Sequence, residues 1–207
     1  MGVMLSGDDA YERVKSGSIA AAKTYEEWAC GSWLSDAGVE SLIQTEIARQ
    51  LYESGKCYVT LETSQQHLKD WDNYFEDFKM PKGLDKRPRF DICVWSKAHK
   101  LSGIIEVKRS KESWQQKKDM KRMRRMMIAA HNDENMSLRY TMVAMYLWAE
   151  NKENLEKLKN KVKKKFDCVN DEVEDENDKI STYFGWHEIE PVAQTDAYQS
   201  LAIAFYS

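Results

Sequence analysis

The sequence of 207 residues lacks most of the short patterns that identify catalytic and metal-binding sites. Its four cysteines are scattered and form no Cys-x-x-Cys pair, which argues against a disulfide framework or zinc site and predicts reduced thiols in a cytoplasmic protein. The four histidines have no metal-ligand spacing, and neither a glycine-rich phosphate loop nor a Gly-x-Ser-x-Gly elbow occurs. No apolar run approaches the length of a membrane span, so no membrane association is expected.

The chain also lacks a strong net charge, because its formal value is only −3. That balance is unfavourable for binding nucleic acid unless the charges are unevenly distributed, and they are. Residues 108–125 contain nine Lys or Arg against two acids, and residues 152–165 contain seven Lys against two Glu. Residues 167–178 then contain seven acids and no base. The sequence therefore predicts two basic helices, followed either by a flexible solvated loop or by an acidic strip that shields the basic helix when nucleic acid is absent.

Two apolar runs, residues 90–95 and 101–107, are separated by a polar segment that contains glycine. This pattern is typical of a β-hairpin. Asp91 lies at the start of the first run, and Glu106 and Lys108 lie near the end of the second. Alternation along a strand puts Glu106 and Lys108 on one face, and antiparallel pairing brings Asp91 beside them. We therefore expect two carboxylates and an ammonium group to converge at one end of a sheet.

Such a cluster suits a hard cation, because Mg²⁺ binds through one or two carboxylates, with water and substrate phosphate completing its octahedral shell. A lysine beside the metal can orient a water molecule or neutralise charge that develops on phosphate. The alternative is an exposed hairpin on which Glu106 and Lys108 form a surface ion pair of little consequence. The position of Asp91 at the mouth of the preceding strand favours the cation site.

Asp91, followed by Glu106-Val107-Lys108 on the next strand, resembles the PD-(D/E)xK nuclease superfamily, whose signature is an acidic residue and then (Asp/Glu)-x-Lys. Phe90 stands where the signature has proline. The resemblance implies an α/β (α+β) fold, with a central mixed sheet flanked by helices and a restriction-endonuclease-like αβββαβ core. It also implies an Mg²⁺-dependent endonuclease, with Mn²⁺ as a substitute. Asp91, Glu106 and the Val107 carbonyl would bind the metal, and Lys108 would orient the attacking water.

The helix that precedes the first strand is marked by apolar residues at helical spacing between an N-cap candidate, Asp36, and a stop at Gly55. Glu40 and Glu46 border its apolar stripe, and Gln44 lies one turn beyond Glu40. Members of the superfamily often place a glutamate of this helix near the metal, so the resemblance implies that Glu40 joins the site, with Glu46 as the alternative. The other interpretation is that both glutamates are solvated at the edge of the stripe.

The basic segment after Lys108 is predicted to form a long helix with a methionine-rich buried side, capped by Ser110 or Ser113. A solvated charged face is the simpler explanation, but cations on adjacent turns repel one another. A polyanion such as nucleic acid, DNA in the first instance, would relieve this repulsion. The residues expected to contact it are Arg109, Lys111, Lys117, Lys118, Lys121, Arg122 and Arg125.

The length and composition predict one nuclease-like domain over residues 1–207. It divides into a helical extension, a core, and a C-terminal helix with two strands, at residues 1–35, 36–148 and 149–207. Besides the hairpin, strands are expected at residues 57–62, 138–148, 180–189 and 201–206.

The function that this pattern favours is a metal-dependent nuclease that hydrolyses phosphodiester bonds of nucleic acid. One alternative is a catalytically silent nucleic-acid-binding module on the same fold. Another is a protein-interaction module that uses residues 63–86, an acidic and aromatic segment that is long for a plain connector. Homodimerisation is compatible with each of these hypotheses.

Overall fold

A six-stranded mixed sheet lies at the centre of the structure, a computed structural model that describes residues 4–29, 40–71, 89–109, 113–134, 136–173, 180–190 and 198–207. In chain order its strands are β1 (Cys57–Ser64), β2 (Arg89–Ser96), β3 (Leu101–Arg109), β4 (Tyr140–Ala149), β5 (Thr182–Ile189) and β6 (Tyr198–Tyr206). The described helices are α1 (Gly7–Trp28), α3 (Glu40–Tyr52), α4 (Gln65–Trp71), α6 (Ser113–His131) and α7 (Lys152–Glu172). The spatial order of the strands is β1-β2-β3-β4-β6-β5, in which β3 and β4 are parallel and the other neighbours are antiparallel.

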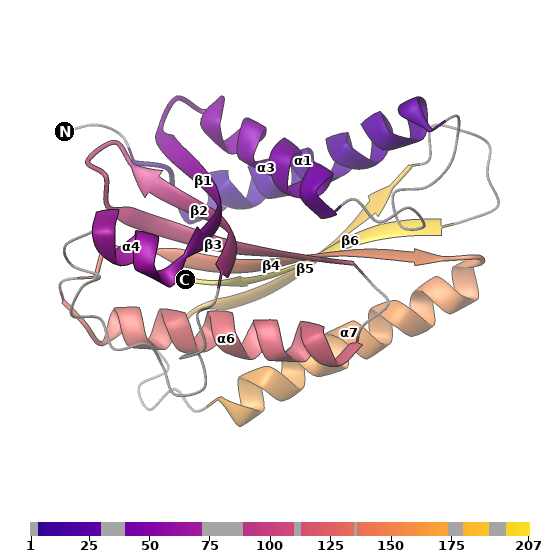
Figure 1. Cartoon of the computed structure of the whole chain (residues 1–207). Coiled ribbons are helices and arrows are strands. Elements are labelled where there is room, and N and C mark those ends of the chain that lie inside the picture. Colours follow the sequence, from indigo (N-terminus) through magenta and orange to yellow (C-terminus); the bar gives the residue numbers. More distant parts are fainter. Residues whose placement is uncertain are drawn as a thin grey trace.

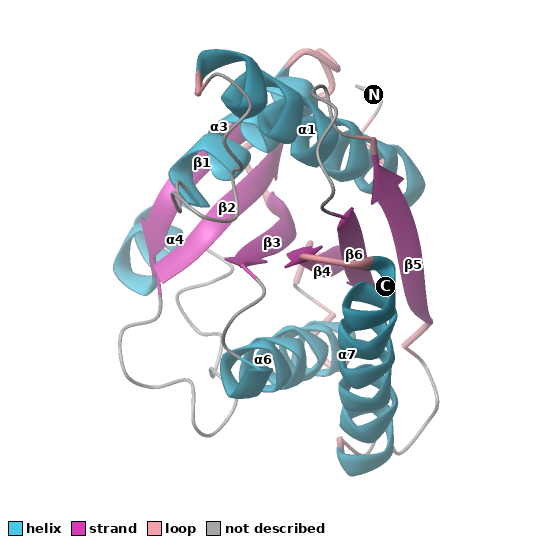
Figure 2. Ribbon diagram, turned by 90° about the vertical axis from the view of Figure 1, so that its right-hand side faces the viewer, coloured by secondary structure: helices cyan, strands magenta, loops and turns pink. Residues whose placement is uncertain are grey.

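Helices cover both faces of this sheet, α1 and α3 on one face and α6 and α7 on the other (Figures 1 and 2). Two apolar cores result, and successive residues of a strand enter different ones. On β3, Ile105 and Val107 pack with α1 and α3, whereas Ile104 packs with α6 and α7. The expected α/β (α+β) class, a central mixed sheet flanked by helices, is therefore confirmed.

The hairpin predicted from the two apolar runs is confirmed as β2 and β3. At its turn the N–H of Ser96 donates to the carbonyl oxygen of Lys100 at 2.8 Å. Helix α6 then carries the chain from β3 to β4, because a tight turn cannot join two parallel strands. The elements α3, β1, β2, β3, α6 and β4 follow one another in the order helix, three strands, helix, strand, with the short α4 inserted after β1.

The apolar run at residues 138–148 was expected to form a strand buried on both faces, and β4 has this character. Every residue of β4 except Trp148 is buried. A strand between helical layers needs apolar side chains on both of its faces, which gives a continuous apolar run instead of an alternating one.

Helix α7 is longer than the sequence indicated, which corrects part of the interpretation of residues 167–178. We expected a basic helix over 152–165 followed either by a flexible loop or by an acidic strip, but α7 continues to Glu172. The physical reason is that its apolar stripe does not stop at Phe166: Val169 is fully buried and keeps the acidic turns attached to the core.

Several expectations fall outside the described residues, including the cap at Asp36, Lys111, and residues 72–86 of the acidic and aromatic segment. The start of that segment is described, because residues 63–64 end β1 and residues 65–71 form α4. The described cysteines, Cys57, Cys93 and Cys168, are free thiols. Of the described helices, none combines the length and the apolar character needed to cross a membrane.

Helices α1 and α3 pack closely because α1 carries glycine at their contact. A Cβ atom placed on Gly17 would lie 2.6 Å from the Cα of Ile47 and 2.9 Å from the carbonyl oxygen of Glu46. Both atoms belong to the backbone of α3, so neither can turn aside as a side chain would. The spacing between the two helices therefore depends on the absence of a side chain at this position.

We predict that Gly17→Ala lowers the free energy of unfolding by about 1 kcal/mol or more, because overpacking outweighs the gain in helix propensity. Ser16→Ala, at the exposed neighbouring position of α1, serves as the control and should change stability little. Urea denaturation of both variants checks this prediction, and a Gly17→Ala protein more stable than the parent would contradict it.

Candidate active site

The candidate active site lies where β2 and β3 diverge. Their pairing runs from Trp95 and Leu101 to Ile92 and Ile105. Beyond that point β2 stays paired with β1, and β3 stays paired with β4. The Asp91 carboxylate spans the divergence and accepts a hydrogen bond of 2.7 Å from the Val107 N–H. A side-chain oxygen thus satisfies a backbone donor near the end of the ladder, which holds the two strands in register while they separate.

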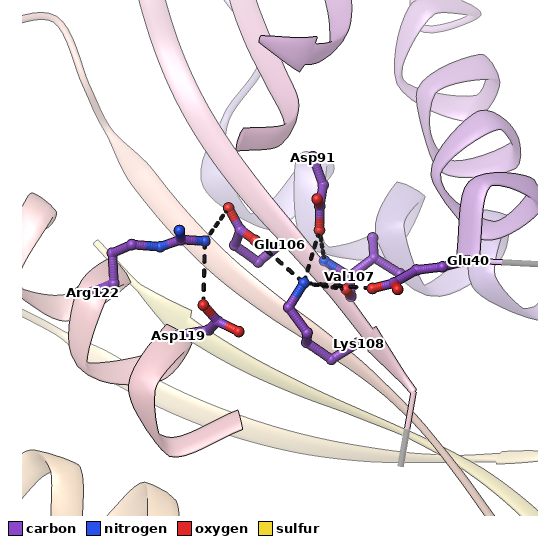
Figure 3. A network of polar contacts seen from close by, with 7 residues as sticks. All are labelled: Glu40, Asp91, Glu106, Val107, Lys108, Asp119 and Arg122. Atoms are coloured by element: carbon purple, nitrogen blue, oxygen red, sulfur yellow. Dashed lines mark hydrogen bonds and ion pairs between the residues drawn. The ribbon is translucent and has the colours of Figure 1, made fainter. Parts of the chain in front are cut away.

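Lys108 is the centre of the polar network at this divergence (Figure 3). Its Nζ lies 3.4 Å from Glu40 Oε1, 3.3 Å from Asp91 Oδ2 and 3.5 Å from Glu106 Oε2. It also donates a hydrogen bond of 2.8 Å to the carbonyl oxygen of Val107. The three carboxylates come from α3, β2 and β3. The expected convergence of Asp91, Glu106 and Lys108 at one end of the sheet is therefore confirmed as geometry.

Glu106 links this network to α6. Its Oε1 lies 2.5 Å from Nη2 of Arg122, and the same guanidinium group lies 3.3 Å from Asp119 Oδ1 (Figure 3). The side chains of Glu106 and Asp119 are each only 2% exposed, and that of Arg122 is 16% exposed. Opposite charges therefore alternate from α3, through β3, to α6, within a region largely closed to water.

Burial controls the ionisation of Glu106. Removal from water raises the pKa of this carboxyl group from 4.5 to about 8, because the neighbouring Arg122 only partly offsets the desolvation and Asp91 adds to it. For Lys108, burial acts to lower the pKa, but the carboxylates of Glu106, Asp91 and Glu40 outweigh it and the net pKa is raised. Lys108 is therefore a cation at neutral pH and not a general base in this arrangement. Burial also raises the pKa of Glu40.

The network has an excess of negative charge. It contains four carboxyl groups and two cations, Lys108 and Arg122, so that full ionisation leaves two negative charges uncompensated. The positive charge of Arg109 acts to lower the pKa of Glu40 and offsets part of the remaining negative charge. Uncompensated charge in a buried site is unfavourable and is relieved by a proton or by an added cation. The raised pKa of Glu106 means that this carboxyl group takes up a proton, which removes one of the uncompensated negative charges.

The chemistry of the donor atoms fits a hard cation, because carboxylate and carbonyl oxygens are the ligands that Mg²⁺ takes. Among the described residues, however, no group of three or more acidic, His or Cys side chains is arranged as a metal site. The ammonium group of Lys108 makes the contacts that Asp91, Glu106 and the Val107 carbonyl would offer a cation. The arrangement is therefore a carboxylate–lysine network whose carboxylate and carbonyl oxygens are of the kind that bind Mg²⁺.

The two glutamates of α3 have different positions. Glu40, in the first turn, contacts Lys108. Glu46 forms an ion pair of 2.7 Å with Arg49, one turn further along the same helix. The structure thus places Glu40 in the network and provides Glu46 with a local partner, which is the arrangement expected from their separation around the helix.

The predicted nucleic-acid-binding residues lie in four different settings. Arg122 turns inward to Glu106 instead of outward, because α6 packs on the sheet with this side of its surface. Lys117 and Lys121 contact Glu172 of α7. The residues left on the exposed side of α6 are Lys118 and Arg125, whereas Arg109 is half-buried and Lys111 lies outside the described part of the chain.

The sequence interpretation did not identify Asp119 as part of the network. It counted Asp119 only as one of two acids in a basic segment, although a signal was present. Asp119 shares a helix face with the buried Met123 and Met126, four and seven residues further on. An acid within an apolar stripe needs a buried partner, and Arg122 supplies it.

Comparison of the chain with models of known families, with curated proteins and with solved structures finds no match.

The raised pKa of Glu106 predicts how stability depends on pH. The carboxyl group ionises near 4.5 when unfolded and near 8 when folded, so the stabilisation from its neutral form falls as the pH rises above about 4.5 and is lost above about 8. Glu106→Gln keeps the neutral form at every pH. In buffer with a chelator, we expect the stability of Glu106→Gln relative to the parent to rise between about pH 5 and about pH 8 and to level off above it. Urea denaturation across this range measures it, and a constant difference would contradict the raised pKa.

Proposed function

We propose that the protein is a metal-dependent nuclease that hydrolyses phosphodiester bonds, with DNA as the expected substrate. The observation that carries this proposal is the convergence of Glu40, Asp91 and Glu106 around Lys108 in a buried, negatively charged network. A divalent cation would remove the excess negative charge of this network more completely than one proton does. The order α3, β1, β2, β3, α6, β4 supports the further proposal that the chain is a member of the PD-(D/E)xK superfamily.

Asp91, Glu106 and the Val107 carbonyl would hold Mg²⁺, or Mn²⁺ in its place, once Lys108 moves away from them. The metal would polarise the phosphate and lower the pKa of a bound water molecule. Two contacts prepare the chain's own groups for this role. The N–H of Val107 fixes one oxygen of Asp91, and Arg122 fixes one oxygen of Glu106, so each carboxylate keeps its other oxygen oriented.

Lys108 and Glu40 would act on the reacting groups. As a permanent cation, Lys108 would stabilise the charge that develops on phosphate and orient the attacking water. Glu40, the most exposed of its three carboxylates, would accept a hydrogen bond from water that enters the site. Because Glu40 lies on α3, across the divergence from β3, we expect it to face the side from which substrate would approach.

A second candidate function is a nucleic-acid-binding module that does not cleave. One observation favours it: Lys108 already neutralises the carboxylates and occupies the place where a cation would lie. The two functions differ in whether the ammonium group leaves when a divalent cation is added.

We predict that Asp91→Ala and Glu106→Ala each reduce Mg²⁺-dependent cleavage of plasmid DNA by at least about 100-fold, because each removes a metal ligand or a charge aimed at the transition state. Lys108→Ala should reduce cleavage to a similar extent, and Glu40→Gln by about tenfold. Cleavage rates with and without Mg²⁺ measure these effects, and circular dichroism checks that each variant folds.

Glu46→Gln is the matched control for Glu40→Gln, since both glutamates lie on α3 and only Glu40 contacts Lys108. Its cleavage rate should equal that of the parent. A parent protein that cleaves neither DNA nor RNA with Mg²⁺ or Mn²⁺, or variants at Asp91 and Glu106 that cleave normally, would contradict the proposed function.

A further inference from the structure

Helices α6 and α7 lie side by side on the face of the sheet opposite α1 and α3 (Figures 1 and 2). Polar contacts of several lysines join them. Lys165 donates to Gln116 Oε1 at 2.9 Å, Lys117 donates to Cys168 Sγ at 3.0 Å, and Lys117 also donates to Glu172 Oε1 at 2.6 Å. Lys121 forms a further ion pair with the other oxygen of Glu172. We call the set Lys117, Lys121, Lys165 and Glu172 the α6–α7 seam.

The seam is a partly exposed, positively charged surface. It contains three lysines and one carboxylate, and the side chains of Lys117 and Lys121 are 33% and 30% exposed. No carboxylate in the described part of the chain forms an ion pair with Lys165. Burial, together with the like charge of Lys161, lowers the pKa of Lys165, as expected for a cation that lacks a counter-charge.

Three of the other lysines of α7 have counter-charges on their own helix. Lys157 pairs with Glu153, Lys159 with Glu156 and Lys163 with Asp167. At the seam the counter-charge is shared between the two helices, and there is one carboxylate for three lysines. Two lysines of α6 share the single carboxylate of Glu172 there.

Glu172 is held as an anion by the donors around it. Hydrogen bonds from Cys168, Lys117 and Lys121 lower the pKa of its carboxyl group to about 2. One thiol and two ammonium groups that converge on a carboxylate form an arrangement that accepts an oxyanion. Phosphate has the same oxygen chemistry and carries a negative charge, so it can take the same donors.

We propose that the α6–α7 seam binds the phosphate backbone of nucleic acid and that the carboxylate of Glu172 occupies this surface until a phosphate group displaces it. This inference rests on the proposed function and adds to it a binding surface and a built-in competitor for that surface. The seam and the candidate active site share helix α6, because Lys121 contacts Glu172 and the next residue, Arg122, contacts Glu106. A backbone bound along the seam would therefore follow the helix that also supports the site.

Glu172→Gln tests the proposal, with Glu153→Gln as the matched control. Both changes remove one exposed negative charge from α7, but Glu172 contacts two lysines of α6 and Glu153 contacts one lysine of its own helix. Binding of a short duplex DNA is measured by fluorescence anisotropy over a salt series, in buffer with a chelator so that cleavage does not interfere.

We expect Glu172→Gln to bind DNA about three- to tenfold more tightly than the parent at low salt. In the variant, Lys117 and Lys121 no longer have to break an ion pair with residue 172 before they contact phosphate. The slope of log affinity against log salt should become steeper by about one to two units, since each freed lysine releases condensed counterions when it contacts a phosphate. Glu153→Gln should lie close to the parent. Adding Lys117→Gln and Lys121→Gln to Glu172→Gln should remove the gain.

Equal binding by Glu172→Gln and Glu153→Gln, while Mg²⁺-dependent cleavage by the parent remains measurable, would overturn the role of the seam and leave the proposed nuclease intact. Absence of DNA binding in all of these proteins, together with absence of cleavage, would overturn the proposed function and the seam with it. A thermal unfolding midpoint for each variant shows whether a change in binding reflects a change in folding.

Discussion

The burial of the Glu106 carboxyl group is the constraint on which the arrangement of the site depends. This carboxyl group lies on β3, between the sheet and α6, with almost no access to water. A charge in that position must be paired, protonated or bound to a cation. Lys108 on its own strand and Arg122 on α6 supply the pairing, and Asp119 in turn supplies a partner for Arg122. One buried acid thus determines what its neighbours on two elements must be.

The divergence of β2 and β3 connects the buried Glu106 carboxyl group, through the network, to the surface of the protein. Continued pairing would have closed the region with backbone hydrogen bonds, whereas the Asp91 carboxylate caps the ladder at the Val107 N–H and leaves the strand ends apart. Glu40 reaches Lys108 from α3 across this opening. The result is a gradient of exposure along the network, from Glu106 inside to Glu40 at the surface. Such a gradient suits a site that must bind a cation inside and meet a charged substrate at its edge.

The sequence predicted what depends on periodicity and on neighbouring positions. The hairpin, the strand β4 and the convergence of Asp91, Glu106 and Lys108 follow from alternation along strands, and Glu40 could be separated from Glu46 by its angle around α3. Features that depend on how a helix is rotated against its neighbours could not be predicted. A count of charges treated Arg122 as a surface cation, because nothing in the count shows that α6 presents this residue to β3. The extension of α7 to Glu172 was missed because acidic composition concealed the apolar position Val169.

The central claim is that the carboxylate–lysine network accepts a divalent cation when Lys108 moves away from it. Isothermal titration of Mn²⁺ into the purified protein tests it most directly, with Glu106→Gln as the variant of the site and Glu46→Gln as the control. We expect saturable binding by the parent and by Glu46→Gln, and loss of that binding in Glu106→Gln, because the variant lacks an anionic oxygen donor. Absence of saturable binding by the parent, with and without duplex DNA, or equal binding by the parent and Glu106→Gln, would contradict it.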